Sequence, residues 1–312
     1  MSAPSRREVT HVDVDGRVVR LTNLDRVLWP ATGWTKGDMV DHYATVSPAL
    51  LPHLAGRPIT MWRFPEGVDR QGWWQNECRG APEWVERYSY VATDGRTHRH
   101  CVVDDLATLL FVANLGTVEI HPFLFRGTAP DRPLEVVFDL DPGDPAGILD
   151  AARWALHLRD VLDAAALRSF AKTSGGKGMH VHAPLDGSHT FDESKAFARG
   201  IAGLLARTYP DEVTDRQARN VRAGKVMVDW LQNDAFRSTI VAYSLRATEV
   251  PRVATPVTWD EVEDAVRRSD EAALAFGPAD VLRRLDRHGD LFEPVLSLRQ
   301  KLPAPSGGPS AP

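Results

Sequence analysis

Cysteine is scarce in this chain, and long apolar runs are absent from it. The 312 residues include two cysteines, Cys78 and Cys101. Two cysteines do not form the disulfide framework of a small secreted protein, so we expect none here and a reducing cytoplasm as the compartment. No apolar run approaches the length of a membrane span, and the polar start of the chain lacks the apolar segment of a signal peptide.

An excess of positive charge is also missing. The formal net charge is -5, which argues against a globally basic protein that coats nucleic acid. Any contact with nucleic acid must therefore come from local basic patches. One such patch is the segment 215–246, which holds six basic residues and three acidic ones. The hydrophobic content of 43% and the charged content of 25% are typical of a globular protein with a substantial core.

Strand and helix patterns are interleaved along the chain. Alternation around Asp15-Gly16 predicts a hairpin over 11–21, and Thr35 is placed to cap a helix over 36–51. Further strands are expected at 57–64, 84–90, 98–103, 118–122, 134–141, 168–173, 179–183, 226–231 and 239–243. Further helices are expected at 104–114, 148–162, 191–209 and, about two of them, from 259 onward. This order predicts an α+β fold with a mixed sheet.

The strand over 134–141 ends in two carboxylates, Asp139 and Asp141, followed by a Pro-Gly turn. Side chains alternate along a strand, so these two aspartates share one face while Phe138 and Leu140 lie on the other. A divalent cation such as magnesium or manganese would relieve the repulsion between them. The competing interpretation is that one aspartate caps the next helix and the other is solvated at the strand end.

A third aspartate, Asp229, lies near the end of the strand over 226–231. Alone it would more often be a turn residue. If the two strand ends meet, Asp139, Asp141 and Asp229 form an oxygen cage for two metal ions, which stabilise attacking and leaving oxygens in phosphoryl or nucleotidyl transfer.

A glycine-rich turn, Ser174-Gly175-Gly176-Lys177-Gly178, joins two expected strands. Its backbone N–H groups, the Ser174 hydroxyl and the Lys177 ammonium suit a triphosphate tail. The glycine spacing is not that of a Walker motif, and a strand rather than a helix follows. Without the aspartates, an ordinary hairpin would explain the turn.

Other polar residues have two interpretations each. Arg222 and Arg246 belong to the basic segment and gain interest as phosphate ligands because they flank Asp229. His121 is either a structural histidine or a donor to a phosphate near the metal site. The histidines and cysteines of 78–101 do not have the spacing of a zinc finger or knuckle, so we expect no zinc there.

Two adjacent tryptophans, Trp73 and Trp74, lie in a segment without helical or strand periodicity. They are either core residues or a platform on which a nucleobase stacks, and the sequence favours neither interpretation.

Four separated motifs together resemble one known family. They are Asp139-Leu140-Asp141, Ser174-Gly175-Gly176-Lys177-Gly178-Met179-His180, Val228-Asp229-Trp230-Leu231-Gln232-Asn233 and Tyr243-Ser244-Leu245-Arg246. Their order resembles the polymerase domain of bacterial DNA ligase D, which belongs to the archaeo-eukaryotic primase superfamily. The resemblance implies a primase-like catalytic core with a mixed, RRM-like β-sheet over about 126–300, an N-terminal α/β part over about 1–125, one domain in all, and a disordered tail at 303–312.

The resemblance also implies roles for individual residues. The metal ligands for two Mn²⁺ or Mg²⁺ ions would be Asp139, Asp141 and Asp229. The residues holding the incoming nucleoside triphosphate would be His121, Ser174, Lys177, Arg222, Gln232 and Arg246. The DNA contacts would be Arg26 and Lys36 on a 5′-phosphate, and Trp73 and Trp74 against the template.

The activity implied is template-dependent nucleotidyl transfer onto gapped or broken DNA, with a preference for ribonucleotides and a role in end joining or gap repair. The implied partners are a separate DNA ligase and a Ku-like end-binding protein, in the bacterial cytoplasm and at its nucleoid. The remaining residues could not hold a ligase or nuclease domain, so we expect a stand-alone or excised polymerase module.

Two other functions use subsets of the same residues. A two-metal nuclease would need the aspartates but not the glycine turn or Arg246. A non-catalytic DNA-end binder would keep Arg26, Lys36 and the tryptophans while tolerating loss of the aspartates. Two positions depart from the family pattern: Arg26 replaces the usual lysine, and Ala242 stands where relatives often have proline.

Overall fold

The computed structural model describes residues 9–92 and 94–304. The disordered tail expected at 303–312 lies, from residue 305 on, outside the described residues. The chain divides into two compact units. Unit 1 comprises Met1–Thr128, Ser238–Thr255 and Ala275–Asp290, and unit 2 comprises Ala129–Arg237, Pro256–Leu274 and Leu291–Pro312.

Unit 2 is built on a six-stranded mixed sheet with the strand order β13-β14-β10-β12-β11-β17. Its strands are β10 (Glu135–Pro142), β11 (Phe170–Thr173), β12 (Met179–Pro184), β13 (Val213–Thr214), β14 (Val226–Asp229) and β17 (Pro256–Val257). The strand β10 lies in the middle and pairs antiparallel with β12 and β14. Its residues Val136, Val137, Phe138 and Leu140 are fully buried, as the apolar run predicted.

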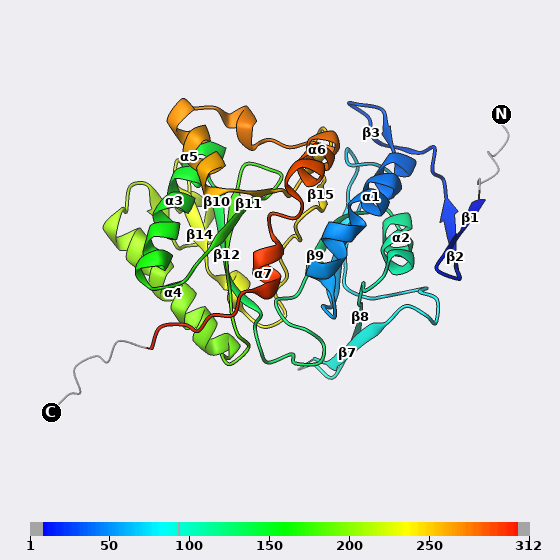
Figure 1. Ribbon diagram of the computed structural model, residues 1–312, viewed down its shortest axis with the longest axis horizontal. Coiled ribbons are helices and arrows are strands. Elements are labelled where there is room, and N and C mark those ends of the chain that lie inside the picture. The colour runs from blue at the N-terminus through cyan, green and yellow to red at the C-terminus, as the bar shows by residue number, and fades with distance from the viewer. Residues whose placement is uncertain (1–8, 93, 305–312) are drawn as a thin grey trace. The chain divides into compact units, whose positions relative to one another are not determined.

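Helices α3 (Ile148–Ala164) and α4 (Phe191–Thr208) pack on this sheet, and α5 (Trp259–Arg268) packs against α3 (Figure 1). A short helix α7 (Glu293–Ser297) contacts β12, and the 3₁₀ turns of unit 2 are η1 (Arg219–Val221), η2 (Leu231–Asn233) and η3 (Glu271–Leu274). Thr190 caps α4 and Thr258 caps α5 through reciprocal capping boxes, which explains where these helices begin.

Unit 1 contains several small antiparallel sheets. Its strands are β1 (Val9–Val14), β2 (Arg17–Thr22), β3 (Val27–Trp29), β4 (Trp34–Thr35), β5 (Ile59–Arg63), β6 (Trp73–Gln75), β7 (Arg87–Val91), β8 (Thr97–Cys101), β9 (Thr117–Pro122), β15 (Leu245–Arg246) and β16 (Arg252–Val253). The largest sheet has the order β6-β5-β9. The hairpin at Asp15-Gly16 and the helix capped by Thr35 are both confirmed.

The helices of unit 1 are α1 (Lys36–Leu54), α2 (Leu106–Asn114) and α6 (Pro278–His288). Helix α1 packs against α2 and α6 (Figure 1), and α2 also contacts β9. Asp105 caps α2 by accepting a hydrogen bond from the backbone N–H of Thr108 at 2.8 Å. In the part of the chain that the structure describes, no helix is long and apolar enough to cross a membrane.

Two expectations were wrong. The segment 71–76 was expected to lack a strand, but its residues Trp73–Gln75 form β6, because Trp62 and Met61 of β5 supply a pairing partner. The segment 239–243 was expected to be a strand, but it runs beside β9 through two backbone hydrogen bonds without forming one.

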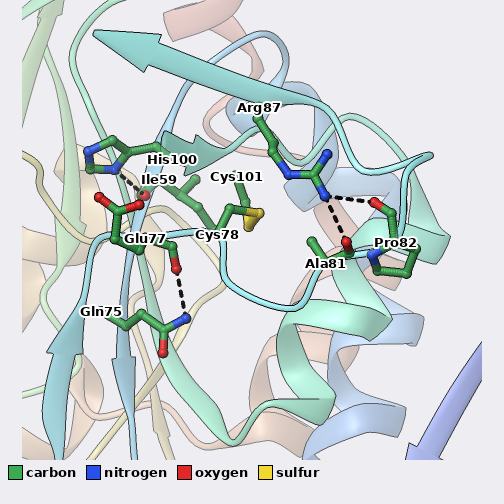
Figure 2. The surroundings of a disulfide bond; sticks show 9 residues. All are labelled: Ile59, Gln75, Glu77, Cys78, Ala81, Pro82, Arg87, His100 and Cys101. Atoms are coloured by element: carbon green, nitrogen blue, oxygen red, sulfur yellow. Dashed lines mark hydrogen bonds between the residues drawn. A yellow bond between two sulfur atoms is a disulfide. The ribbon is translucent and has the colours of Figure 1, made fainter. Parts of the chain in front are cut away.

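The two cysteines were expected to give no disulfide framework. Cys78 and Cys101 are bonded to each other, with their Cα atoms 5.0 Å apart. Figure 2 shows the bond linking the segment that follows β6 to the end of β8. The backbone N–H of Cys78 also donates to the carbonyl of Arg99 at 2.7 Å, so the fold itself brings the two sulfurs together. The two cysteines are 23 residues apart in the sequence, and this spacing alone did not predict that they would be in contact.

Candidate active site

A row of four polar residues crosses the sheet of unit 2. Asp139 on β10 lies opposite Asp229 on β14 and, on its other side, opposite His180 on β12. His180 in turn lies opposite Lys172 on β11. Directly opposed residues on antiparallel strands project from the same face. The sheet register therefore sets Asp229, Asp139, His180 and Lys172 side by side, as the hypothesis of converging aspartates required for Asp139 and Asp229.

The third aspartate, Asp141, follows two positions along β10 on the same face. Its carboxylate accepts a hydrogen bond from the guanidinium of Arg222, which precedes β14. Gly143 lets these segments approach, because a Cβ at this position would lie 2.1 Å from the carbonyl oxygen of Arg222. Arg222 therefore lies beside the aspartates and is bonded to Asp141.

The electrostatics of the row suit a cation. Asp229 is 8% exposed. Burial raises the pKa of Asp229, and the charge of Asp139 acts in the same direction. Carboxylate oxygens set against one another in this way are the donors that hard divalent cations prefer. The two carboxylates therefore have the donor chemistry for a divalent metal. Within residues 9–92 and 94–304, however, the structure gathers no group of three or more His, Cys, Asp or Glu side chains that could hold a metal ion.

His180 and Lys172 are residues that sequence reasoning did not single out. The Nε2 of His180 lies 3.3 Å from Oδ1 of Asp139, and its Nδ1 lies 3.1 Å from Nζ of Lys172. Burial lowers the pKa of His180 to about 4, and the charge of Lys172 acts in the same direction. A neutral imidazole accepts from Lys172 and donates to Asp139, which orients that carboxylate. Strand alternation in the sequence could have identified these two residues only together with the pairing of β10, β11 and β12, which puts Lys172 and His180 on the same face of the sheet as Asp139.

The glycine turn joins β11 to β12 beside this row. The backbone N–H of Ser174 donates to the carbonyl of Gly178 at 3.0 Å, which closes the turn. A Cβ at Gly178 would lie 2.7 Å from the carbonyl oxygen of Leu140, the residue between the two aspartates of β10. The turn therefore contacts β10 near its C-terminal end, where the two aspartates lie. Lys177 is exposed there, and its ammonium donates to Asp144 at 2.7 Å.

The turn after β14 places Gln232. The amide of Gln232 lies 3.4 Å from Oδ2 of Asp229, and the backbone N–H of Leu231 donates to Oδ1 of Asp229 at 2.8 Å. Asn233 anchors this turn, because its buried side chain bonds both the N–H and the carbonyl of Val137 at 2.8 and 2.7 Å. The sequence analysis assigned no role to Asn233, whose side-chain hydrogen bonds connect η2 to β10.

In unit 1, His121 and Arg246 meet at one carboxylate. Glu119 of β9 accepts from Nε2 of His121 at 2.9 Å and from Nη1 of Arg246 at 3.1 Å. Burial acts to raise the pKa of Glu119, but the hydrogen bond from His121 and the charge of Arg246 outweigh it and hold the pKa low. Glu119 was missed from the sequence, although alternation along β9 puts it on the face of His121.

The two tryptophans lie on β6 at the edge of the sheet β6-β5-β9 and are 45% and 48% exposed. The ring of Trp74 meets the ring of His121 edge to face, with centroids 4.8 Å apart. The guanidinium of Arg63 lies 5.2 Å from the ring centroid of Trp73. The core interpretation of the pair is therefore wrong, and half-exposed indoles of this kind can stack on a base.

Arg26 and Lys36 differ in their exposure. The backbone N–H of Lys36 donates to the carbonyl of Arg26 at 2.7 Å, so the β3–β4 hairpin brings the two residues together. The Arg26 guanidinium donates to Glu66 at 2.6 Å and is partly exposed. The ammonium of Lys36 is buried, donates to the carbonyl of Thr22 at 2.5 Å and to Asn114 at 2.7 Å, and burial lowers its pKa to about 8.

The comparison with solved structures defines the class of protein. The fold is similar to the structure described as "Polymerase Domain from Mycobacterium tuberculosis Ligase D in complex with DNA", with a TM-score of 0.81 and 36% sequence identity, over 90% of this chain and 98% of that one. The fold is that of a primase-polymerase, a type of nucleotidyltransferase, and the expected α+β class is confirmed.

The sequence comparisons name the family. The family model "LigD, primase-polymerase domain" matches residues 35–292, so this chain belongs to the LigD primase-polymerase family, as the motifs indicated. The "Multifunctional non-homologous end joining protein LigD" of Mycolicibacterium smegmatis is 37% identical over 280 residues, which is 89% of this chain and 36% of that protein. The "Bifunctional non-homologous end joining protein LigD" of Bacillus subtilis is 32% identical over 250 residues, 80% of this chain and 40% of that protein. The chain thus spans well under half the length of these relatives.

Proposed function

We propose that this protein adds nucleotides, with a preference for ribonucleotides, to primer 3′ ends at DNA gaps or double-strand breaks. The reaction would be template-dependent and would serve end joining or gap repair. The observation that carries the proposal is the cross-strand pair of Asp139 and Asp229, with Asp141 on the same face and the glycine turn beside it. Membership of a nucleotidyltransferase family favours this function over a nuclease or a non-catalytic end binder.

The aspartates Asp139, Asp141 and Asp229 would hold two Mn²⁺ or Mg²⁺ ions. When bound, such ions stabilise the attacking and the leaving oxygen of the transfer. The chain's own groups then bind the nucleoside triphosphate through charge-assisted and backbone hydrogen bonds. The proposed set comprises His121, Ser174, Lys177, Arg222, Gln232 and Arg246. Arg222 and Lys177 would exchange their present carboxylate partners for phosphate oxygens.

The DNA contacts proposed are Arg26 and Lys36 for a 5′-phosphate and the tryptophans of β6 for the template. The exposure of Trp73 and Trp74 supports the stacking role. The similar mycobacterial domain is described in complex with DNA, and the curated relatives are named for non-homologous end joining, which supports a DNA substrate here. A separate DNA ligase and a Ku-like end-binding protein are the proposed partners, at the nucleoid in the bacterial cytoplasm.

Primer extension on gapped, 5′-phosphorylated DNA tests the catalytic assignment. Wild-type protein should extend the primer with manganese or magnesium and should use ribonucleotides better than deoxyribonucleotides. Asp139→Ala combined with Asp141→Ala should lower extension about 100-fold or more, because the charge that develops at the transferred phosphate loses its stabilisation. Extension that survives this change, or a primer that shortens instead, would exclude the proposed chemistry.

DNA affinity tests the 5′-phosphate contacts. Arg26→Ala and Lys36→Ala should each weaken binding to phosphorylated gaps about tenfold, as expected for loss of a hydrogen bond to a charged group. Arg70→Ala is the control, because Arg70 is a well-exposed arginine of the same unit whose ion pair to Asp69 is long, at 3.5 Å. An equal loss on unphosphorylated DNA would contradict the assignment of these residues to the 5′-phosphate.

A further inference from the structure

One buried carboxylate links two of the residues proposed to bind the nucleotide. Glu119 is 4% exposed and lies on β9, two positions before His121. Its Oε2 accepts from Nε2 of His121 at 2.9 Å and from Nη1 of Arg246 at 3.1 Å. Its Oε1 accepts from the backbone N–H of Ala247 at 3.0 Å. Three donors from two separate segments of the chain therefore converge on this side chain.

The arrangement ties the short strand β15 to β9. Arg246 ends β15, which contacts β9 (Figure 1), and Ala247 follows it directly. The bond to Ala247 holds the backbone, and the bond to Nη1 holds the guanidinium, so both the position and the direction of Arg246 depend on Glu119. The bond to His121 fixes the imidazole with Nε2–H toward the carboxylate, and the Trp74 ring limits its rotation from the side.

Arg246 has capacity left for a ligand. Its Nε is buried and has no hydrogen-bond partner among the described residues, and its side chain keeps 29% of its surface exposed. A buried guanidinium N–H without an acceptor is costly, and an anion that approaches the group supplies one. A glutamate that served only to neutralise Arg246 would have no reason to hold His121 and the Ala247 N–H as well.

We propose that Glu119 is a positioning residue for nucleoside triphosphate binding, which holds His121 and Arg246 as one preorganised pair of phosphate donors. The inference rests on the proposed function, because it assigns these two residues to the incoming nucleotide. Glu119 itself contacts no substrate. Its carboxylate reduces the conformational freedom that the two donors would otherwise lose on binding.

Single-nucleotide insertion kinetics with Glu119→Gln test the inference. Glutamine keeps the size of the side chain but replaces one acceptor oxygen by a donor, so it cannot accept all three hydrogen bonds. The KM for the nucleoside triphosphate should rise about 10- to 100-fold, with a smaller change in kcat, as is typical when a residue that orients ligand-binding groups is lost. Glu119→Asp, which keeps the charge, should recover part of this loss.

A matched control is Glu135→Gln. Glu135 is another buried glutamate bonded to a histidine, with Oε2 2.7 Å from Nδ1 of His182, and it lies on β10 outside the set of residues proposed to bind the nucleotide. This variant should lose stability in thermal unfolding while its KM stays within about twofold of wild type. A Glu119→Gln protein with a lowered melting temperature and an unchanged KM would show a purely structural role and overturn the inference.

A double-mutant cycle separates this inference from the proposed function. If Glu119 acts through His121 and Arg246, the effects of Glu119→Gln and Arg246→Met on KM should not add, and the double variant should have a KM below the value that two independent effects predict. Additive effects would refute the positioning role while leaving the polymerase assignment standing. A wild-type protein that neither extends primers nor binds ATP in calorimetry would instead refute the proposed function, and the inference with it.

Discussion

Removal of the Cys78–Cys101 disulfide offers a quantitative test of the fold of unit 1. The bond closes a loop of 23 residues in sequence, which includes the hairpin of β7 and β8. The chain-entropy relation for a loop of this length gives about 3 kcal/mol of stabilisation at 25 °C, because the bond restricts the unfolded chain. Cys78→Ser combined with Cys101→Ser should therefore lower the free energy of unfolding by about 3 kcal/mol.

Urea unfolding, followed by tryptophan fluorescence, measures this change. With a slope of about 3 kcal/mol per M, the midpoint should fall by about 1 M. Either single variant should behave like the double variant, because each removes the same bond. In the presence of a thiol reductant the wild type should shift to nearly the same midpoint. This last comparison isolates the covalent bond from the packing of the two buried side chains.

Two results would refute the reasoning. The first is two free thiols in native wild-type protein purified without reductant, which would mean that Cys78 and Cys101 are not bonded in the native state and contribute no covalent stabilisation. The second is a disulfide that forms, by thiol titration, yet leaves the urea midpoint unchanged on reduction. That outcome would mean that the unfolded chain is already restricted between the two cysteines.

Two further predictions concern pH and backbone packing. Burial lowers the pKa of His42 in α1 to about 4 from 6.5, so the unfolded chain binds a proton on this residue more tightly than the folded chain does. The contribution of neutral His42 to the free energy of unfolding is therefore complete above pH 6.5 and is lost as the pH falls toward 4. The loss should be about 2 kcal/mol at pH 5 in urea unfolding, and the pH dependence should be shallower by this amount in His42→Gln; an unchanged dependence would contradict it. Gly143→Ala would place a Cβ 2.1 Å from the carbonyl oxygen of Arg222, so it should lower the free energy of unfolding by about 1–3 kcal/mol and should also lower primer extension. Gly200→Ala is the control, because nothing lies within 4 Å of a Cβ at that position, and it should change neither stability nor extension. Equal behaviour of the two variants would refute the close contact at Gly143.

Local features of this protein were predictable because they depend on neighbouring residues. The shared face of Asp139 and Asp141 follows from strand alternation, and the helix start at Thr35 follows from a reciprocal cap with Asp38. The hairpin at Asp15-Gly16 follows from turn chemistry, with both residues at positive φ. The family followed from the order of four motifs, which is itself a property of the sequence.

The pairings between distant segments were decided by the tertiary structure. Alternation says which face a side chain takes, but the partner strand and its register depend on hydrogen bonds between segments far apart in the chain. Asp229 opposite Asp139, and His180 between Asp139 and Lys172, are consequences of that register. Sequence reasoning could state the first only as a condition and did not find the second.

Burial and long-range contacts decided the rest. The role of Glu119 depends on its contact with Arg246, which the strand β15 brings to it. The cysteines are bonded because β8 lies beside the segment after β6. Lys36, expected from the resemblance to contact a 5′-phosphate, lies buried with its ammonium bonded to Thr22 and Asn114. The sequence by itself determined the family, the local elements and the residue types of the site. Which side chains meet, and which are withdrawn from solvent, only the tertiary structure decided, because contact and desolvation arise from packing between segments that no local pattern encodes.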